Sequence, residues 1–256
     1  PEEFWEIDLD VVSKQIEKLK FILNRRKNDP LLKQEDVKLI RDKINDNQLS
    51  INEIIKKPVK VKPKPPFITS TLQQSASTRL GFNVKRTMRV AQKLYEAGYI
   101  TYMRTDAPSL SKDSINDARN FINENLGENY LTNAPRIYSS TENAQEAHEA
   151  VRPTNTFLRS SDLINLSEEE VKLYKLIWER FVASQMPDAE YLSTSAKTFV
   201  DEHIFVAKGR ELVFDGFTKV LKTSSKEEDI LPSLNEGDSL TVENINLEQK
   251  YTKPPS

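Results

Sequence analysis

Tyr102 and Arg104, in the segment Gly98–Asp106, have side chains whose types and spacing could transfer a phosphoryl group. In an extended segment, positions i and i+2 point to the same side, so the phenol and the guanidinium would lie together. A tyrosine hydroxyl is a poor nucleophile at neutral pH because its pKa is about 10. A guanidinium can favour the phenolate and can hold the attacked phosphate through two hydrogen bonds. The pair therefore suits a tyrosine nucleophile, with a packed tyrosine beside a surface arginine as the structural alternative.

The window from Arg79 to Arg104 concentrates positive charge in a chain whose net charge is −2. It has a local charge of +5, from Glu96 and six cationic residues, which are Arg79, Lys85, Arg86, Arg89, Lys93 and Arg104. Lys85, Arg89 and Lys93 are four residues apart and would share one face of a helix. Such a helix, leading into a short aromatic strand, resembles a helix-turn-helix or winged module that contacts phosphates. A solvated charged face is the alternative.

A histidine and an arginine follow in the segment 142–153. His148 and Arg152 stand at i and i+4, so on a helix ended by Pro153 they would face the same way and could clamp an anion. The HExxH zinc pattern needs a second histidine at position 152, where this chain has arginine, so a histidine metal site is disfavoured. A buried neutral histidine near a surface arginine is the alternative interpretation.

Hydrophobic periodicity predicts the elements that must position these side chains. Short strands are expected over 1–9 and 51–60. Apolar residues at helical spacing predict helices over Val11–Arg26, Leu31–Asn45, Thr71–Gly81, Val84–Ala97, Asp113–Asn125 and Glu168–Ala183. Asn83 is expected to cap the helix that follows it, and Ser167 with Glu170 forms a capping box for the last helix.

From residue 191 onward the apolar period becomes two, which predicts antiparallel strands. They are expected over Thr194–Val200, Ile204–Ala207, Glu211–Phe214, Thr218–Leu221 and Ser239–Val242, with a turn at Lys208–Arg210. Four prolines in 57–66 exclude a helix or a central strand and mark a connector. We therefore expect an α+β multi-domain chain. Residues 1–66 would open a β domain with a helical segment and linker, 67–189 would form an inserted helical, winged-helix-like domain that bears the tyrosine, and 190–256 would complete the β domain.

Composition limits the class of protein. The chain has 256 residues, 30% of them charged, and no cysteine, which excludes disulfides and thiolate zinc sites within it. No apolar run approaches the roughly 18 residues of a membrane span, so we expect no membrane partner. With a net charge of −2, binding of an anion must come from a local patch. The chain begins at Pro1 without a methionine and ends at Ser256 without a closing element, so we interpret it as part of a longer protein.

Four ordered motifs make the chain similar to a known family. They are PFITSTLQQ (66–74), YEAGYITYMRTD (95–106), QEAHEAVRP (145–153) and FDGFTKV (214–220). With these motifs the chain resembles the bacterial type IA DNA topoisomerases from about residue 58 to residue 255, whereas the likeness over 10–52 is weak. The segment Tyr102–Asp106 carries most of the specificity, and the order of four motifs adds to it.

The resemblance implies a role for individual residues. Tyr102 would attack DNA and form a 5′-phosphotyrosine, while Arg104 would neutralise the scissile phosphate. His148 would contact that phosphate from a neighbouring helix, and Arg152 would hold the DNA backbone nearby. Further DNA contacts are implied for Arg79, Lys85, Arg86, Arg89, Lys93, Thr69, Ser70, Gln73 and Gln74.

The resemblance also implies an activity that this chain would hold only in part. The family cuts one strand, passes another through and reseals the cut without ATP, which relaxes negative supercoils. The helical domain would be a mobile gate and the β domain an arch. Mg²⁺ would be bound by an acidic Toprim domain outside this sequence, so we expect no metal site within the chain and no relaxation by it alone. Expected partners are single-stranded or negatively supercoiled DNA and the remaining domains of the same polypeptide, in the cytoplasm at the nucleoid.

Three other classes of protein compete with this interpretation. A non-enzymatic winged-helix module that binds single-stranded DNA would share the basic window but would not need Tyr102. Tyrosine recombinases place an arginine and histidine set before the tyrosine, whereas His148 and Arg152 follow it, and rolling-circle nicking proteins need a His-hydrophobe-His motif that this sequence lacks. A structural interaction domain would leave the basic window and the pair of Tyr102 and Arg104 unexplained.

Overall fold

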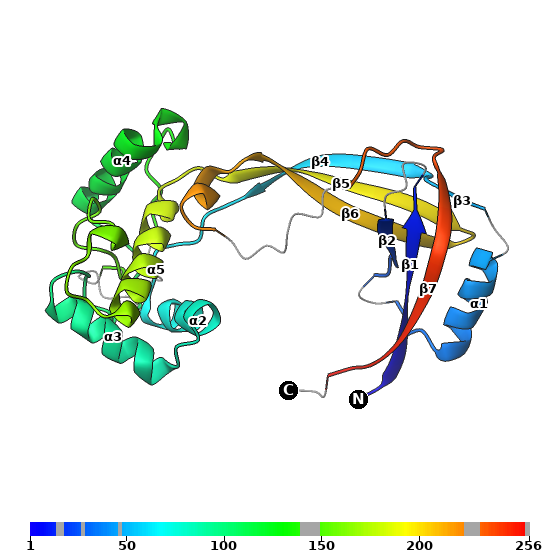
Figure 1. The fold of residues 1–256 in the computed structure, drawn as a ribbon, viewed down its shortest axis with the longest axis horizontal. Helices are drawn as coiled ribbons and strands as arrows, with labels where there is room; N and C mark the ends of the chain where they lie inside the picture. Colours follow the sequence, from blue (N-terminus) through cyan, green and yellow to red (C-terminus); the bar gives the residue numbers. More distant parts are fainter. Residues whose placement is uncertain (14–17, 27–28, 46–47, 139–148, 223–230, 254–256) are drawn as a thin grey trace. The chain divides into compact units, whose positions relative to one another are not determined.

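The computed structural model describes residues 1–13, 18–26, 29–45, 48–138, 149–222 and 231–253. The chain divides into two compact units (Figure 1). Unit 1 comprises Pro1–Val59, Tyr191–Val213 and Ser225–Ser256, and unit 2 comprises Lys60–Glu190 and Phe214–Ser224. Unit 2 therefore interrupts unit 1 twice along the sequence. Among the described residues, no helix combines the length and the apolar character that crossing a membrane requires.

The described strands form a seven-stranded sheet in the order β3-β7-β1-β2-β6-β5-β4. Their bounds are β1 Glu3–Val12, β2 Lys18–Leu23, β3 Leu49–Ser50, β4 Glu53–Val61, β5 Ala189–Val200, β6 His203–Phe214 and β7 Ser239–Tyr251. β1 pairs antiparallel with β2 and β7, β2 with β6, and β3 with β7. Glu3 lies opposite Tyr251, so the first and last strands are neighbours (Figure 1). The predicted α+β class with an antiparallel sheet is confirmed.

One helix, α1 (Gln34–Asn45), packs on the sheet of unit 1. Val37, Ile40 and Ile44 recur at helical spacing and are buried in one cluster with Ile7 and Phe21 of the sheet. The helix predicted over 31–45 is thereby confirmed, although it begins at Gln34.

The helix predicted over 11–26 is wrong. β1 continues to Val12, and β2 follows at Lys18–Leu23. In β2, Leu19 and Phe21 are buried while Lys20 is exposed, so the period is two. β2 pairs with β1 on one side and with β6 on the other, and these ladders supply the backbone hydrogen bonds that a helix would otherwise make internally.

Further differences from the predictions concern β4, β6 and residues 218–221. β4 passes through Pro58 and ends at Val61, and it can hold a proline because it is the edge strand of the sheet. β6 runs unbroken through Lys208–Arg210, where a turn was predicted. The strand predicted over 218–221 is instead part of a 3-10 turn, η3 (Gly216–Lys219). A Cβ at Gly216 would lie 2.2 Å from the carbonyl oxygen of Asp188, so this turn requires glycine.

Unit 2 holds the four helices that periodicity predicted beyond residue 70, and they are α2 (Thr69–Leu80), α3 (Val84–Glu96), α4 (Lys112–Leu126) and α5 (Glu168–Ser184). The Asn83 side chain caps α3 by accepting from the amide of Arg86 at 2.8 Å. The predicted capping box opens α5, where the Ser167 amide donates to Glu170 at 2.7 Å. Two short 3-10 turns, η1 (Glu128–Tyr130) and η2 (Ser160–Asp162), complete the unit.

The core of unit 2 lies between α3 and α5, with α2 packed against both. Its buried side chains include Val90 and Leu94 from α3 and Leu173 and Ile177 from α5. These helices form the frame on which the segment with Tyr102 is mounted, since Met103 is buried in the same cluster.

Candidate functional site

The segment that bears the tyrosine belongs to no strand ladder, and Met103 lies at a bend. Its burial alternates: Tyr102 and Arg104 are exposed, whereas Met103 and Thr105 are buried. The Tyr102 side chain is 47% exposed, which leaves a nucleophile accessible to a polymer. The exposure of both residues shows that the phenol and the guanidinium lie on the solvent side of the segment.

Thr69, the first residue of α2, holds this segment in place. Its hydroxyl donates to the carbonyl oxygens of Met103 and Thr105 at 2.9 and 3.0 Å, and it accepts from the amide of Thr105 at 2.8 Å. The Thr69 amide donates to the Thr105 carbonyl at 2.9 Å as well. The sequence implied a DNA contact for Thr69, but these bonds commit its side chain to positioning the residues on either side of Arg104.

The start of the same segment pairs with residues 150–154. The Thr101 amide donates to the Arg152 carbonyl at 2.9 Å, and the Arg152 amide donates to the Thr101 hydroxyl at 3.0 Å. The Thr154 amide donates to the Tyr99 carbonyl at 3.0 Å, and Ile100 forms a bridge with Pro153. Tyr102 is therefore held between two sets of backbone hydrogen bonds.

The sequence predicted a helix that carries Arg152 and ends at Pro153, and this prediction is wrong. Val151 pairs with Phe67 and Pro153 with Ile100, so this stretch is extended. The residue before a proline avoids the helical region because the proline ring crowds it, and this favours the extended form at Arg152. His148, the partner expected on that helix, lies outside the described residues.

Arg152 is anchored by a carboxylate three residues earlier. Its Nε and Nη2 each lie 2.9 Å from an oxygen of Glu149, a bidentate pair, and its Nη1 donates to the Pro153 carbonyl at 3.0 Å. Glu149 also accepts from the Ser111 amide at 2.9 Å and from the Ser114 hydroxyl at 3.1 Å, at the start of α4. Burial raises the pKa of Glu149, but the hydrogen bonds from Arg152, Ser111 and Ser114 outweigh burial and hold this pKa below its usual value.

A hollow of about 360 Å³ lies beside Arg104. It brings together Arg104 and the carboxylate of Asp106 with Thr69 and Ser70, at the first turn of α2. The N-terminal end of a helix carries free amides and a partial positive charge, which favour an anion. Arg104 has no hydrogen-bond or ion-pair partner among the residues that the structure describes, so its guanidinium is available to a ligand. The hollow could therefore seat a phosphate next to the exposed tyrosine.

A second tyrosine, Tyr95 of α3, packs against Tyr102. The ring centroids lie 5.2 Å apart with an interplanar angle of 62°, an edge-to-face contact. Both rings are exposed on their other sides. The contact fixes the direction of the Tyr102 ring without burying its hydroxyl. Sequence reasoning missed this partner, because Tyr95 belongs to the preceding helix and its spacing from Tyr102 indicated no contact.

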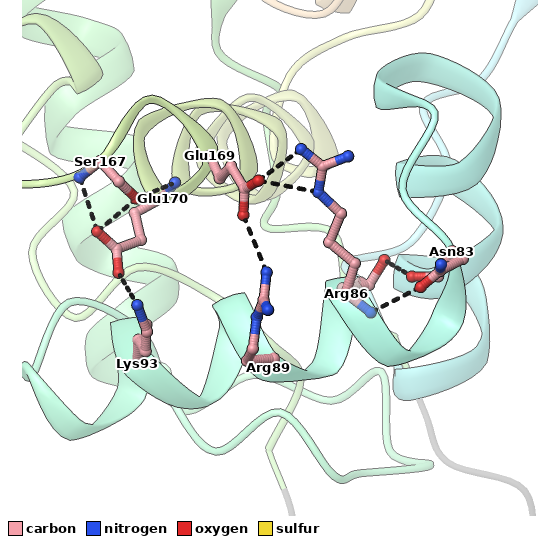
Figure 2. Close-up of polar contacts among 8 residues, drawn as sticks. Asn83, Arg86, Arg89, Lys93, Ser167, Glu169 and Glu170 are labelled. Atoms are coloured by element: carbon pink, nitrogen blue, oxygen red, sulfur yellow. Dashed lines mark hydrogen bonds and ion pairs between the residues drawn. The ribbon is translucent and has the colours of Figure 1, made fainter.

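The basic face of α3 faces acidic side chains at the start of α5 (Figure 2). The Arg86 Nε lies 3.0 Å from a Glu169 oxygen, Arg89 lies 3.4 Å from the other oxygen, and Lys93 lies 3.6 Å from Glu170. The bond from Arg86 is the main cause that lowers the pKa of Glu169. These contacts favour a structural role for residues that the sequence assigned to DNA.

Four other predicted DNA contacts, Lys85, Arg79, Gln74 and Gln73, lie in different surroundings. Lys85 is exposed and has no ion pair within the described part of the chain. Arg79 donates to the Lys222 carbonyl at 2.7 Å, and with Gln74 it lines a second hollow in unit 2. Gln73 is half-buried on α2 and lines neither of the two hollows.

Sequence reasoning also missed two charged residues near these sites. Glu149 stands three residues before Arg152, a spacing that could have indicated the ion pair. Arg180 occupies a buried position of α5 next to Phe181, and a charged residue on a buried helix face is a usable signal. Within the described ranges, no group of three or more His, Cys, Asp or Glu side chains is arranged to hold a metal ion.

Comparison with known proteins places the whole chain in one family. A sequence model of the DNA topoisomerase family matches residues 1–256. The proteins named DNA topoisomerase 1 from Pseudomonas aeruginosa and Escherichia coli are 44% and 45% identical over 260 residues, which cover 100% of this chain and 30% of each relative. The structure of full-length topoisomerase I from Thermotoga maritima aligns with a TM-score of 0.76 at 31% identity, and the match covers 100% of this chain and 42% of that one.

The chain thus spans about a third of the length of the curated relatives that it matches. Its antiparallel sheet agrees with the structural match found for the full chain. The chain belongs to the bacterial type IA DNA topoisomerase I family.

Proposed function

We propose that this chain is the tyrosine-bearing part of an ATP-independent enzyme that cuts and reseals one DNA strand. The observation that carries the proposal is the exposed pair of Tyr102 and Arg104, mounted on a segment that Thr69 and Thr101 hold by backbone hydrogen bonds. A nucleophile and a phosphate ligand need this fixed geometry, because misplaced reacting groups lose most of their rate advantage. Residues 67–189 would act as the gate and the β domain as the arch.

In the proposed step, the Tyr102 hydroxyl loses its proton and its oxygen attacks the phosphorus of a phosphodiester. The bond to the 3′-oxygen breaks, and that oxygen leaves as a hydroxyl after taking a proton. The new 5′-phosphotyrosine ester is close in energy to the phosphodiester, so attack by the 3′-hydroxyl reseals the strand without ATP. Arg104 would stabilise the negative charge that builds up on the phosphate, with the first turn of α2 beside it.

Arg152 would hold the backbone of the DNA next to the cut. Glu149 fixes the orientation of its guanidinium, and part of the donor capacity of Arg152 remains for a phosphate. His148 is retained as a phosphate ligand by the family resemblance alone. Mg²⁺ would be held by a domain outside this chain, as the family resemblance implies. Relaxation of negative supercoils and association with the nucleoid in the cytoplasm would be properties of the full-length protein.

The test is covalent capture of DNA by the chain joined to the remaining domains of its polypeptide. Single-stranded oligonucleotides labelled at the 3′ or the 5′ end are incubated with Mg²⁺ and then denatured. We expect the 3′ label, and not the 5′ label, to stay on the protein, because the tyrosine retains the 5′-phosphate of the downstream piece. Tyr102→Phe should lose this adduct and keep its affinity for the oligonucleotide.

The alternative, a winged-helix module that binds single-stranded DNA without chemistry, predicts that wild-type protein and Tyr102→Phe behave alike. Covalent label on both proteins would show that another tyrosine is the nucleophile. The isolated chain is expected to bind single-stranded DNA weakly and to leave a supercoiled plasmid unrelaxed. Relaxation by the isolated chain in the presence of Mg²⁺ would contradict this part of the proposal.

A further inference from the structure

A second hollow in unit 2, of about 380 Å³, is lined by positive charge without a compensating carboxylate. Its cations are Lys62 and Lys64 of the connector, Arg79 of α2 and Arg180 of α5. No Asp or Glu lines it, which sets it apart from the face of α3. Four cations around one hollow produce a local field that attracts an anion.

Arg180 is the buried member of this group, at 9% exposure. Its Nε donates to the Pro65 carbonyl at 2.6 Å, and its guanidinium lies 4.7 Å from the centre of the Phe67 ring. Its Nη atoms have no hydrogen-bond partner within the described part of the chain. Burial first, and then the nearby charge of Arg79, lower the pKa of Arg180 to about 10. The group still carries its charge at neutral pH, although a buried charge without a partner is unfavourable.

The remaining lining is suited to the oxygens of a phosphate. Gln74 is exposed on α2 and offers a side-chain amide, whereas the hydroxyl of Thr78, one turn later, donates to the Gln74 carbonyl at 2.9 Å. Lys62 and Lys64 are exposed on either side of the buried Pro63, and neither has an ion pair among the described residues. Flexible lysines, an arginine fork, amides and hydroxyls are the groups that commonly contact the backbone of nucleic acids.

The hollow also lies on the same helix as the candidate site. Ser70, at the first turn of α2, lines the hollow beside Arg104, whereas Arg79 stands in the last turn. These positions are about 14 Å apart along the helix, a distance that a few nucleotides of a single strand can cover. One strand that follows α2 could therefore contact both hollows.

We propose that the hollow formed by Lys62, Lys64, Arg79 and Arg180 binds a phosphate of the single-stranded DNA backbone. This inference rests on the proposed function because it takes DNA as the ligand, but it requires no cleavage. The contact is independent of base sequence and anchors the strand away from Tyr102. Inorganic phosphate shares the chemistry, and the test separates the two sources.

The test measures binding of fluorescein-labelled oligothymidylate to the 256-residue chain by anisotropy over a series of KCl concentrations. Lys62→Gln/Lys64→Gln removes two exposed charges, and Lys38→Gln/Lys56→Gln is the charge-matched control at exposed lysines of unit 1. Each phosphate contact adds about 0.7 to the slope of log K against log salt for a single strand. We expect the first variant to lower this slope by about 1.4, with roughly tenfold weaker binding at low salt, and the control to retain most of both.

Arg180→Met tests the buried member and should lower the slope by about 0.7, with circular dichroism and thermal unfolding to verify the fold. If this variant fails to fold, the double lysine variant decides alone, because both of its positions are exposed. The proposal would be overturned if Lys62→Gln/Lys64→Gln had the same affinity and salt slope as its control. Absence of binding by the wild-type chain would overturn it too.

Two further measurements separate the proposals and the ligand sources. Inorganic phosphate, added at constant ionic strength, is expected to displace the oligonucleotide poorly. If inorganic phosphate displaced the oligonucleotide at a concentration equal to that of the nucleotide phosphates, the hollow would be a site for a free anion. That result would refute the assignment to DNA. If Tyr102 forms the adduct in the full-length protein while the lysine variants bind like the control, only the second hollow is wrong. If the slopes fall as expected and no adduct forms, only the cleavage proposal is wrong.

Discussion

Unit 2 carries its positive charge in two different settings. On α3, Arg86, Arg89 and Lys93 face Glu169 and Glu170, so their charge is balanced within the protein. Around the two hollows, neither Arg104 nor Arg180 forms an ion pair with a described residue, although the carboxylate of Asp106 lines the hollow beside Arg104. The number of basic residues therefore does not identify a surface that binds nucleic acid. What matters is whether the fold leaves the charge without a counter-charge.

The two settings also differ in how firmly they are built. The ion pairs of α3 join side chains that are largely exposed, and such pairs contribute little to stability. The segment around Arg104 is held through the backbone by a partly buried hydroxyl that makes several bonds at once. Loss of one partner there leaves backbone groups unsatisfied, which is more costly than loss of an exposed ion pair.

The strongest test of this contrast is removal of the Thr69 hydroxyl. Thr69→Val keeps the shape but leaves the amide of Thr105 without its acceptor, so we expect about 1–3 kcal/mol lower stability. Formation of the covalent adduct by the full-length protein should fall by roughly ten- to a hundredfold, since small misplacements are costly. Thr69→Ser retains the oxygen and should recover most of the activity. Urea unfolding and adduct yield are the measurements, and equal yields for the Val and Ser variants would contradict a positioning role.

Arg104 and Arg89 allow a direct comparison of the two settings. Arg104→Gln should weaken binding of a labelled single strand by several-fold and lower the salt slope by about 0.7, because an available phosphate contact is lost. Arg89→Gln removes the same charge from a position next to Glu169 and should change binding little. Anisotropy titrations over a KCl series measure both variants. A larger loss for Arg89→Gln would reverse our ranking of the two surfaces.

Glu149→Gln probes the pair that anchors Arg152, and we expect about 1 kcal/mol lower stability at pH 7. The pKa of Glu149 is lower in the folded state than in the unfolded state, where it is near 4.5. The contribution of its charge to the free energy of unfolding is therefore complete above the unfolded-state pKa, and it is lost as the pH falls through the folded-state pKa. The wild type and the variant should therefore converge in stability as the pH falls below the lowered pKa of Glu149 in the folded state. Urea unfolding at several pH values measures this, and a constant difference would argue against the assigned charge.

The smallest change in DNA affinity is expected when the cations of α3 lose their acidic partner. Glu169→Gln leaves Arg86 and Arg89 without their carboxylate, so affinity for a single strand should rise by about twofold at low salt. The anisotropy titration that compares Arg104 and Arg89 measures this rise. Glu168→Gln is the matched control, because that carboxylate pairs with Lys172 of its own helix. A rise of the same size in both variants would mean that only net charge matters.

Much of the local structure followed from patterns in the sequence. The capping groups Asn83 and Ser167 are where their types predict, because a cap depends on residues three positions away. The spacing of Tyr102 and Arg104 indicated a shared side of an extended segment, and the alternating burial agrees with it. The helix predicted over 11–26 failed because Leu19 and Phe21 fit a short strand equally well, and pairing with β1 and β6 decides between the two.

The functional roles of the basic residues could not be ranked in the same way. Arg86 and Arg79 look alike in the sequence, yet one faces Glu169, which lies 83 residues away, and the other lines a hollow with Arg180. The backbone amide of Arg152 likewise finds its acceptor in the distant Thr101. No local pattern contains these partners, so no local pattern could assign them.

The sequence by itself determined the family, through four ordered motifs, and the chemistry that Tyr102 and Arg104 can perform. These properties depend on residue types and short spacings, which a sequence states directly. Only the tertiary structure decided which cations are balanced, that Thr69 positions the segment of Arg104, and that Arg180 joins Lys62 and Lys64 in one hollow. The physical reason is that charge balance and hydrogen-bond geometry arise between residues far apart in the chain, and packing alone brings those residues within reach.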